Sequence, residues 1–147
     1  MYRFIFAAAL AISTASFAHA GDTPSNPESM AYVVNLENGT TVQSPVTVIF
    51  GLAGMGVAPA GVEKEGTGHH HILLNRAAFG EGADDAEMIA NGIPADENHI
   101  HFGGGQTQTT LDLPPGEHTI QLVLGDHFHV PHTPPVVSEV ITFTVTE

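Results

Sequence analysis

The sequence predicts an all-β protein built as a single antiparallel β-sandwich with long loops rich in glycine and proline. Short apolar segments alternate with polar residues in the way that half-buried strands require. The 147 residues include 16 glycines and 10 prolines, many of which separate these segments, and helical periodicity is almost absent. The chain has no cysteine and therefore no disulfides, so packing must stabilise the sandwich.

The first half of the chain predicts two strands and a long loop. Residues 31–36 form the first strand, and the Asn38-Gly39 pair that follows sets a turn because it accepts positive φ at low cost. Residues 42–52 form the second strand, with apolar side chains on one face. Residues 53–68 contain five glycines and a proline, which indicates a long loop that closes over a site.

A buried strand and an irregular acidic segment come next. Residues 69–75 become apolar toward their end and predict a buried strand. Residues 76–98 are irregular and acidic, with at most one helical turn near residues 83–90. Loops of this length usually have a function or are mobile.

The clearest strand signals lie in the last third of the chain. Residues 109–113 alternate, Pro114-Pro115-Gly116 makes a turn, and residues 118–125 alternate again. Residues 136–146 predict the last strand. Short strands separated by Gly and Pro turns are typical of an immunoglobulin-like sandwich.

The N-terminus predicts an exported protein. Arg3 precedes an apolar run, and small residues up to Ala20 suit a cleavage site, so residues 1–20 are predicted to be a signal peptide. Residues 21–30 are polar with two prolines and predict a flexible leader, and residues 31–147 predict the His-rich sandwich domain. No later segment is apolar enough to span a membrane, so we expect a periplasmic or secreted protein.

The charge of the chain excludes several partners. Three basic and 16 acidic residues give a formal net charge of −13, and removal of Arg3 with the predicted signal peptide makes it one unit more negative. Such a protein repels nucleic acid and anionic membranes and attracts cations. The absence of cysteine also excludes thiolate catalysis and thiolate metal sites. Asp84, Asp85 and Glu87 lack the ligand spacing of a calcium loop and predict a solvated acidic loop.

Histidine carries most of the chain's candidate chemistry. Eight of the ten histidines lie in three clusters, within residues 69–71, 99–101 and 127–132. Neutral imidazole is the commonest protein ligand for late transition metals. Side chains at positions i and i+2 share a face of a strand, so each cluster offers a His-X-His pair that can direct two rings at one ion. The intervening Ile100 and Phe128 are predicted to face the core.

Other residues are assigned supporting roles. His70 is predicted to form hydrogen bonds or to belong to a second site, and His132, among prolines, can supply a rigid further ligand. Asp126 is predicted to orient an imidazole N–H. The isolated His118 is predicted to lie at the surface or a sheet edge. Met55 is predicted to pack, although its thioether would favour Cu(I) over zinc if it reached a site.

Four motifs of the chain resemble a known family: GMGVAPAG (54–61), TGHHH (67–71), IHFGGGQT (100–107) and GDHFHVPHTPPV (125–136). They are similar to those of small bacterial periplasmic proteins grouped as domain of unknown function 4399. The resemblance spans nearly all of the chain that follows the predicted signal peptide. It implies a secreted sandwich without an established activity and gives no catalytic residue. Its histidine motifs coincide with His69, His70, His71, His101, His118, His127, His129 and His132, and His99 lies just outside them.

A weaker resemblance concerns the start of the domain. Residues 35–50 are similar to the first hairpin of periplasmic copper-resistance sandwiches and of other bacterial immunoglobulin-like modules. Many such domains begin in this way, so the resemblance supports the fold more than it supports copper.

These observations predict a periplasmic protein that binds copper, or alternatively zinc, through clustered histidines. Cu(II) comes first because it leads the affinity order of first-row divalent ions at an all-imidazole site. Binding needs neutral imidazole, so affinity should fall as the pH passes about 6. The candidate ligands are His69, His71, His99, His101, His127, His129 and His132.

Three alternatives remain open. In the first, the domain is an interaction module for an envelope protein or polymer, and its histidines brace the loops through hydrogen bonds. In the second, the protein is a metal-dependent enzyme whose ion activates water, although no nucleophile or acid–base pair stands out. In the third, the imidazoles sense pH.

Overall fold

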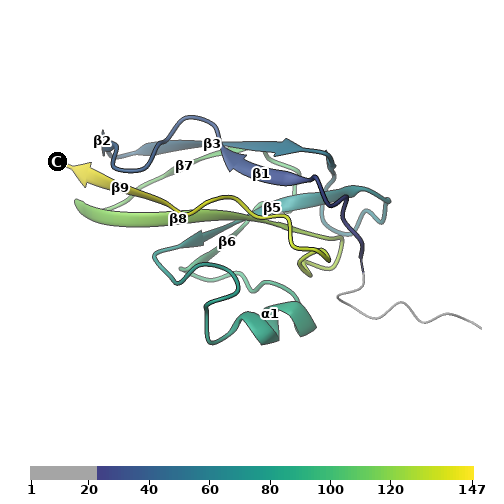
Figure 1. Cartoon of the computed structure of the whole chain (residues 1–147). Coiled ribbons are helices and arrows are strands. Elements are labelled where there is room, and N and C mark those ends of the chain that lie inside the picture. Colours follow the sequence, from purple (N-terminus) through teal and green to yellow (C-terminus); the bar gives the residue numbers. More distant parts are fainter. Residues whose placement is uncertain (1–22) are drawn as a thin grey trace, which may run out of the picture.

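Two β-sheets face each other in the computed structural model, which describes residues 23–147 (Figure 1). The predicted signal peptide, residues 1–20, lies outside the described residues. The elements in chain order are β1 (Met30–Val33), β2 (Thr41–Gln43), β3 (Val46–Ala53), β4 (Gly56–Val57), β5 (Thr67–Leu74), α1 (Asp85–Asn91), β6 (His99–His101), β7 (Gln108–Leu111), β8 (Gly116–Gly125) and β9 (Ile141–Thr146).

The strands divide into a small sheet and a large sheet. The small sheet has the order β1-β3-β7, and the large sheet has the order β2-β9-β8-β5-β4, with β6 also paired to β5. The longer pairings are antiparallel, whereas the short β2–β9 and β4–β5 pairings are parallel. The prediction of an all-β sandwich is therefore confirmed. Within the described residues, no helix is long and apolar enough to cross a membrane.

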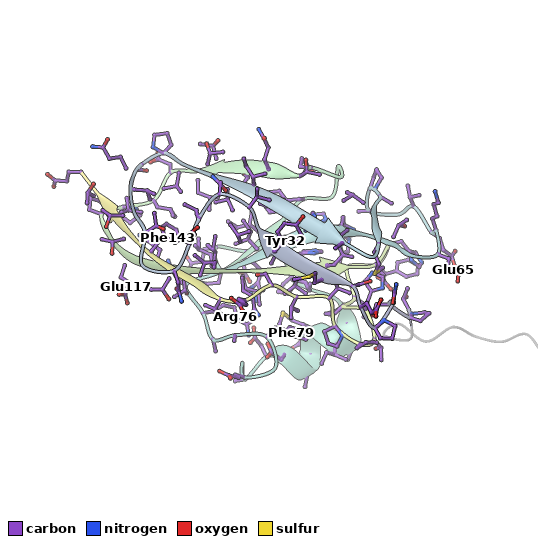
Figure 2. All side chains as sticks on the ribbon, turned by 45° about the horizontal axis from the view of Figure 1, so that its top comes forward. Tyr32, Glu65, Arg76, Phe79, Glu117 and Phe143 are labelled. Atoms are coloured by element: carbon purple, nitrogen blue, oxygen red, sulfur yellow. The ribbon has the colours of Figure 1, made fainter. Side chains whose placement is uncertain are left out.

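The main core lies between the sheets. Phe50 of β3 faces Ile72 of β5, Leu122 of β8 and Phe143 of β9 in one buried cluster. Figure 2 places Phe143 within this packing. Alternate residues of each strand point inward, as period-2 geometry requires.

The other face of the large sheet is also covered, and α1 lies on this outer side in Figure 1. Met88 of α1 packs with Leu73 of β5 and Val123 of β8 in a second buried cluster. Seven of the eight residues of β5 are therefore buried, and its side chains are enclosed on both faces. This double coverage explains why three consecutive histidines, residues 69–71, are all 0 % exposed.

Several predicted boundaries were wrong. The strand predicted over residues 42–52 is divided into β2 and β3 at Pro45, since proline has no N–H to donate to a ladder. The loop over residues 53–68 contains the short β4, and the irregular segment 76–98 contains the seven-residue α1. The last strand begins at Ile141 rather than at residue 136.

Candidate metal centre

Four histidines meet on the outer face of the large sheet. His69 and His71 point to this face from β5, with the i, i+2 spacing that the sequence predicts. The antiparallel β5–β6 register places His101 opposite His71. His129 comes from the loop after β8. Each of the four rings offers a nitrogen, and these nitrogens lie within 4.8 Å of one another.

The rings are packed against each other directly. The Nε2 atom of His69 lies 3.0 Å from Nδ1 of His129, which is a hydrogen bond between two imidazoles. The His71 and His101 rings stack with centroids 5.1 Å apart, and His101 meets the edge of His129 at 4.6 Å. Ligation at roughly 2.0–2.1 Å needs small movements of such rings rather than a rearrangement of the fold.

Asp126 builds the loop that carries His129. Its Oδ1 atom accepts hydrogen bonds from the backbone N–H groups of Phe128 and Val130, and its Oδ2 atom accepts one from Thr23. His129 itself adopts a left-handed backbone with φ 69°. The prediction that Asp126 orients an imidazole N–H is replaced by this role, in which the carboxylate positions His129 through the backbone.

Burial keeps three rings of the cluster, those of His69, His71 and His101, neutral near pH 7. It lowers the pKa of His69 to about 4, helped by the neighbouring His129 and His101 and opposed by Asp126. Burial, together with the nearby rings of His69, His101 and His129, lowers the pKa of His71 to about 2. The pKa of His101 is also lowered, first by burial and then by His129. Uncharged rings are the form that metals bind.

Four of the eight ring nitrogens of the cluster are buried without a hydrogen-bond partner. Among the described residues, the buried atoms without a partner include His69 Nδ1, both nitrogens of His71 and His101 Nε2. An unpaired buried polar group costs about 1–3 kcal/mol, so structural bracing does not explain these rings. Within the described residues, the His69–His129 bond is the one side-chain hydrogen bond of this cluster that braces a loop, and it leaves these four nitrogens unpaired. The four residues could hold a metal ion.

The structure leaves three of the seven candidate ligands outside the group. His99 lies two residues before His101 on β6, and in the β5–β6 register it pairs with Leu73 rather than with a histidine. There its Nε2 atom lies 2.7 Å from Arg76 and its Nδ1 atom lies 2.8 Å from Asp96. Figure 2 shows Arg76 near α1, where it also binds the buried Asp85.

His127 and His132 are held apart by the loop. The His127 ring packs against Phe128 at an interplanar angle of 41°, with centroids 4.1 Å apart, and the His127 carbonyl accepts a hydrogen bond from the Gly61 N–H. His132 is buried on the opposite, inner face of β5, beside Gly68. Burial lowers the pKa of His132, while Asp126 and the nearby backbone oppose this shift. Neither nitrogen of His132 makes a hydrogen bond of standard geometry.

Five predicted environments can be compared with the structure. Phe128 is 63 % exposed, so its assignment to the core was wrong, because residues 127–129 form a turn rather than a strand. His70 makes no side-chain hydrogen bond and packs against Phe50.

His118 is buried and forms hydrogen bonds with Asn75 and Pro114, so its surface assignment was also wrong. Asp85 is buried rather than solvated, and Met55 packs against the core as expected.

Glycines make room for the rings, a role that the sequence did not reveal. A Cβ atom at Gly125 would lie 2.7 Å from the His71 ring, and one at Gly103 would lie 2.6 Å from Nε2 of His101. The run of three glycines at residues 103–105 was visible, but only the β5–β6 register connects it with the cluster.

A Gly103→Ala substitution tests this packing. Gly103 has no positive φ, so alanine should be accepted by the backbone while its methyl group displaces the His101 ring. We expect a roughly 10-fold or larger loss of metal affinity, as for disturbed support of a ligand. Gly104→Ala is the matched control, since a Cβ there meets only the flexible Gln106 side chain. Equal affinities of the two variants in metal titration would refute the role of Gly103.

Comparison with protein families gives one match. The family described as "Domain of unknown function (DUF4399)" matches residues 48–146, a span that includes all four clustered histidines. Comparison with curated proteins and with solved structures gave no match.

Proposed function

The chain belongs to the family described as domain of unknown function (DUF4399), a description that states no activity, and we propose from the site itself that the protein binds a transition-metal ion. The ligands are His69, His71, His101 and His129. The observation that carries the proposal is the convergence of four ring nitrogens within 4.8 Å of one another. His69 and His71 are fully buried and His101 and His129 are half-buried, so these rings have lost much of their hydration, which a shared metal ion would compensate.

Copper is the first choice of ion and zinc the second. An all-nitrogen site suits Cu(II), which binds most tightly among the first-row divalent ions, and a four-histidine set also suits tetrahedral Zn(II). No carboxylate belongs to the group, which disfavours calcium and magnesium. All four ligands are neutral imidazoles, so they would not neutralise the charge of a bound divalent ion.

The periplasm, or the space outside the cell, is the proposed location. The support is the N-terminal sequence, with one arginine, an apolar run and small residues up to Ala20. The chain has no thiols that an oxidising compartment would convert to disulfides, so a metal site made of imidazoles would stay intact there. The acidic surface attracts cations to such a protein.

Isothermal titration of the metal-free chain with Cu(II) and Zn(II), at pH 7.5 and pH 5.5, tests the proposal. We expect one ion per chain bound tightly at pH 7.5, with the affinity reduced at pH 5.5 as protons compete. Binding should also raise Tm, because a ligand at 100 times its Kd stabilises the native state by about 2.7 kcal/mol. Binding no tighter than that of stray surface histidines would refute the metal site and favour the interaction module.

A further inference from the structure

Two more buried histidines lie on the other side of β5. His70 and His132 are 0 % and 1 % exposed, and none of their four ring nitrogens makes a hydrogen bond of standard geometry, although the backbone of Thr23 and Pro24 lies near the His132 ring. Strand alternation turns His70 toward the inside of the sandwich, away from His69 and His71, where its ring centroid lies 5.2 Å from that of Phe50. These rings therefore belong to a different space from the four-histidine cluster.

Backbone pairing brings the two rings to neighbouring places. The inner-face position two residues before His70 on β5 is Gly68. A Cβ atom at Gly68 would lie 2.8 Å from Nε2 of His132 and 2.9 Å from the Leu124 side chain. Leu124 is in turn the register partner of His70 on β8. His132 thus occupies the space left by a missing side chain, one inward-facing step along the strand from His70.

A thioether and a hydroxyl lie at the same end of the sandwich. Met55 belongs to the short connection from β3, in the small sheet, to β4, in the large sheet, and its side chain packs against the core. Ser29 precedes β1, and its buried hydroxyl has no partner. This end carries the loop with Glu65 in Figure 2, opposite the end with Glu117. The buried histidine nitrogens without a partner thus lie on both faces of β5, within the part of the chain that the structure describes.

We propose that His70, His132 and Met55 form a second site, for a soft monovalent ion such as Cu(I). Two imidazoles and a thioether are a ligand set that Cu(I) prefers and that Zn(II) does not. Thioether and imidazole are neutral ligands, and a monovalent ion costs less to bury among them than a divalent one. The site is independent of the four-histidine cluster, with which it shares no ligand.

One carboxylate lies beside this second site. Asp126 is 2 % exposed, and its charge acts on the His132 ring, as it does on His69 across the strand. Its side chain also binds Thr23, whose neighbour Pro24 is bridged to Thr133 next to His132. A single buried negative charge balances a monovalent ion.

Titration with Ag(I), a redox-stable substitute for Cu(I), tests the inference on the full chain. The four-histidine cluster is first saturated with Zn(II), and Ag(I) is then added while methyl signals of [¹³C-methyl]methionine are recorded. We expect one further equivalent of Ag(I) and a shift of the Met55 methyl signal, with the exposed Met30 as internal reference. If Zn(II) does not bind, the same Ag(I) titration is run on the metal-free chain, so failure of the first site does not decide the second.

Matched variants identify the ligands. Met55→Leu keeps the volume and apolar character of the side chain and should reduce Ag(I) affinity at least 10-fold while leaving Zn(II) binding unchanged. Met30→Leu should change neither. A His70→Leu variant, whose folding is verified by its Zn(II) binding, should abolish the second equivalent. Retention of this equivalent in Met55→Leu with an unmoved Met55 signal in the wild type would overturn the site, as would the absence of Ag(I) binding.

Discussion

Replacing His129 by asparagine should abolish tight metal binding while leaving the fold intact. Asparagine is chosen because it tolerates the left-handed backbone of φ 69° at this position. The change removes one of four imidazoles, and the loss should exceed the roughly 10–100-fold cost of disturbing a residue that only supports a ligand. Titration with Zn(II) and Cu(II) at pH 7.5 measures the effect.

His127→Asn is the matched control for this experiment. His127 lies in the same turn, two residues away, but its ring packs against the exposed Phe128 outside the group. We expect its metal affinity to remain within about twofold of the wild type. If instead His127→Asn weakens binding as strongly as His129→Asn, the ion is held by a different set of histidines from the one proposed.

The metal-free protein should lose stability as the pH falls below 6.5. His69 and His70 have pKa values of about 4 in the folded protein, and His71 of about 2, against 6.5 in the unfolded chain. The unfolded chain therefore takes up more protons in this range, and the stabilisation present above pH 6.5 is lost progressively toward pH 4. With about 1.4 kcal/mol per unit of pKa difference, His70 alone contributes on the order of 3 kcal/mol.

Urea unfolding in the presence of a chelator, from pH 8 to pH 4, measures this loss. Domains of this size are stable by about 5–15 kcal/mol, so the loss caused by three buried histidines is of the same order as the whole free energy of unfolding. His70→Leu removes one of these groups and should make the dependence on pH shallower. A free energy of unfolding that stays constant between pH 7 and pH 5 would contradict the burial of these rings.

Much of the fold follows from local patterns in the sequence. The alternation over residues 118–125 predicted most of β8, and the apolar end of residues 69–75 predicted β5, because side-chain period depends only on neighbouring residues. The short β4 was missed, and the helix α1 is longer than the single helical turn expected near residues 83–90. Their stability comes from contacts with distant residues, such as Met88 with Leu73 and Val123, which no local pattern reveals.

The sequence predicted that the candidate site consists of histidines, but it did not predict which of the histidines come together. The i, i+2 rule placed His69 and His71 on one face, since they lie on a regular strand. It did not apply to His127 and His129, which lie in a turn. It held for His99 and His101, but the register sets His99 beside Leu73, where Arg76 binds it. Register and loop geometry are long-range properties, so the choice among the histidines needed the structure.

The run of three histidines on β5 also has a consequence for how the chain folds. Residues 69–71 present imidazole on both faces, so a slip of β5 by one residue against β8 would still bury histidine on each side. Hydrophobic burial thus discriminates weakly between the two pairings at this end of the strand. A bound metal ion would discriminate strongly, because only the native pairing turns His69 and His71 together toward His101. If the proposed ion binds while the chain folds, it would favour the native strand alignment and so act as a template for folding.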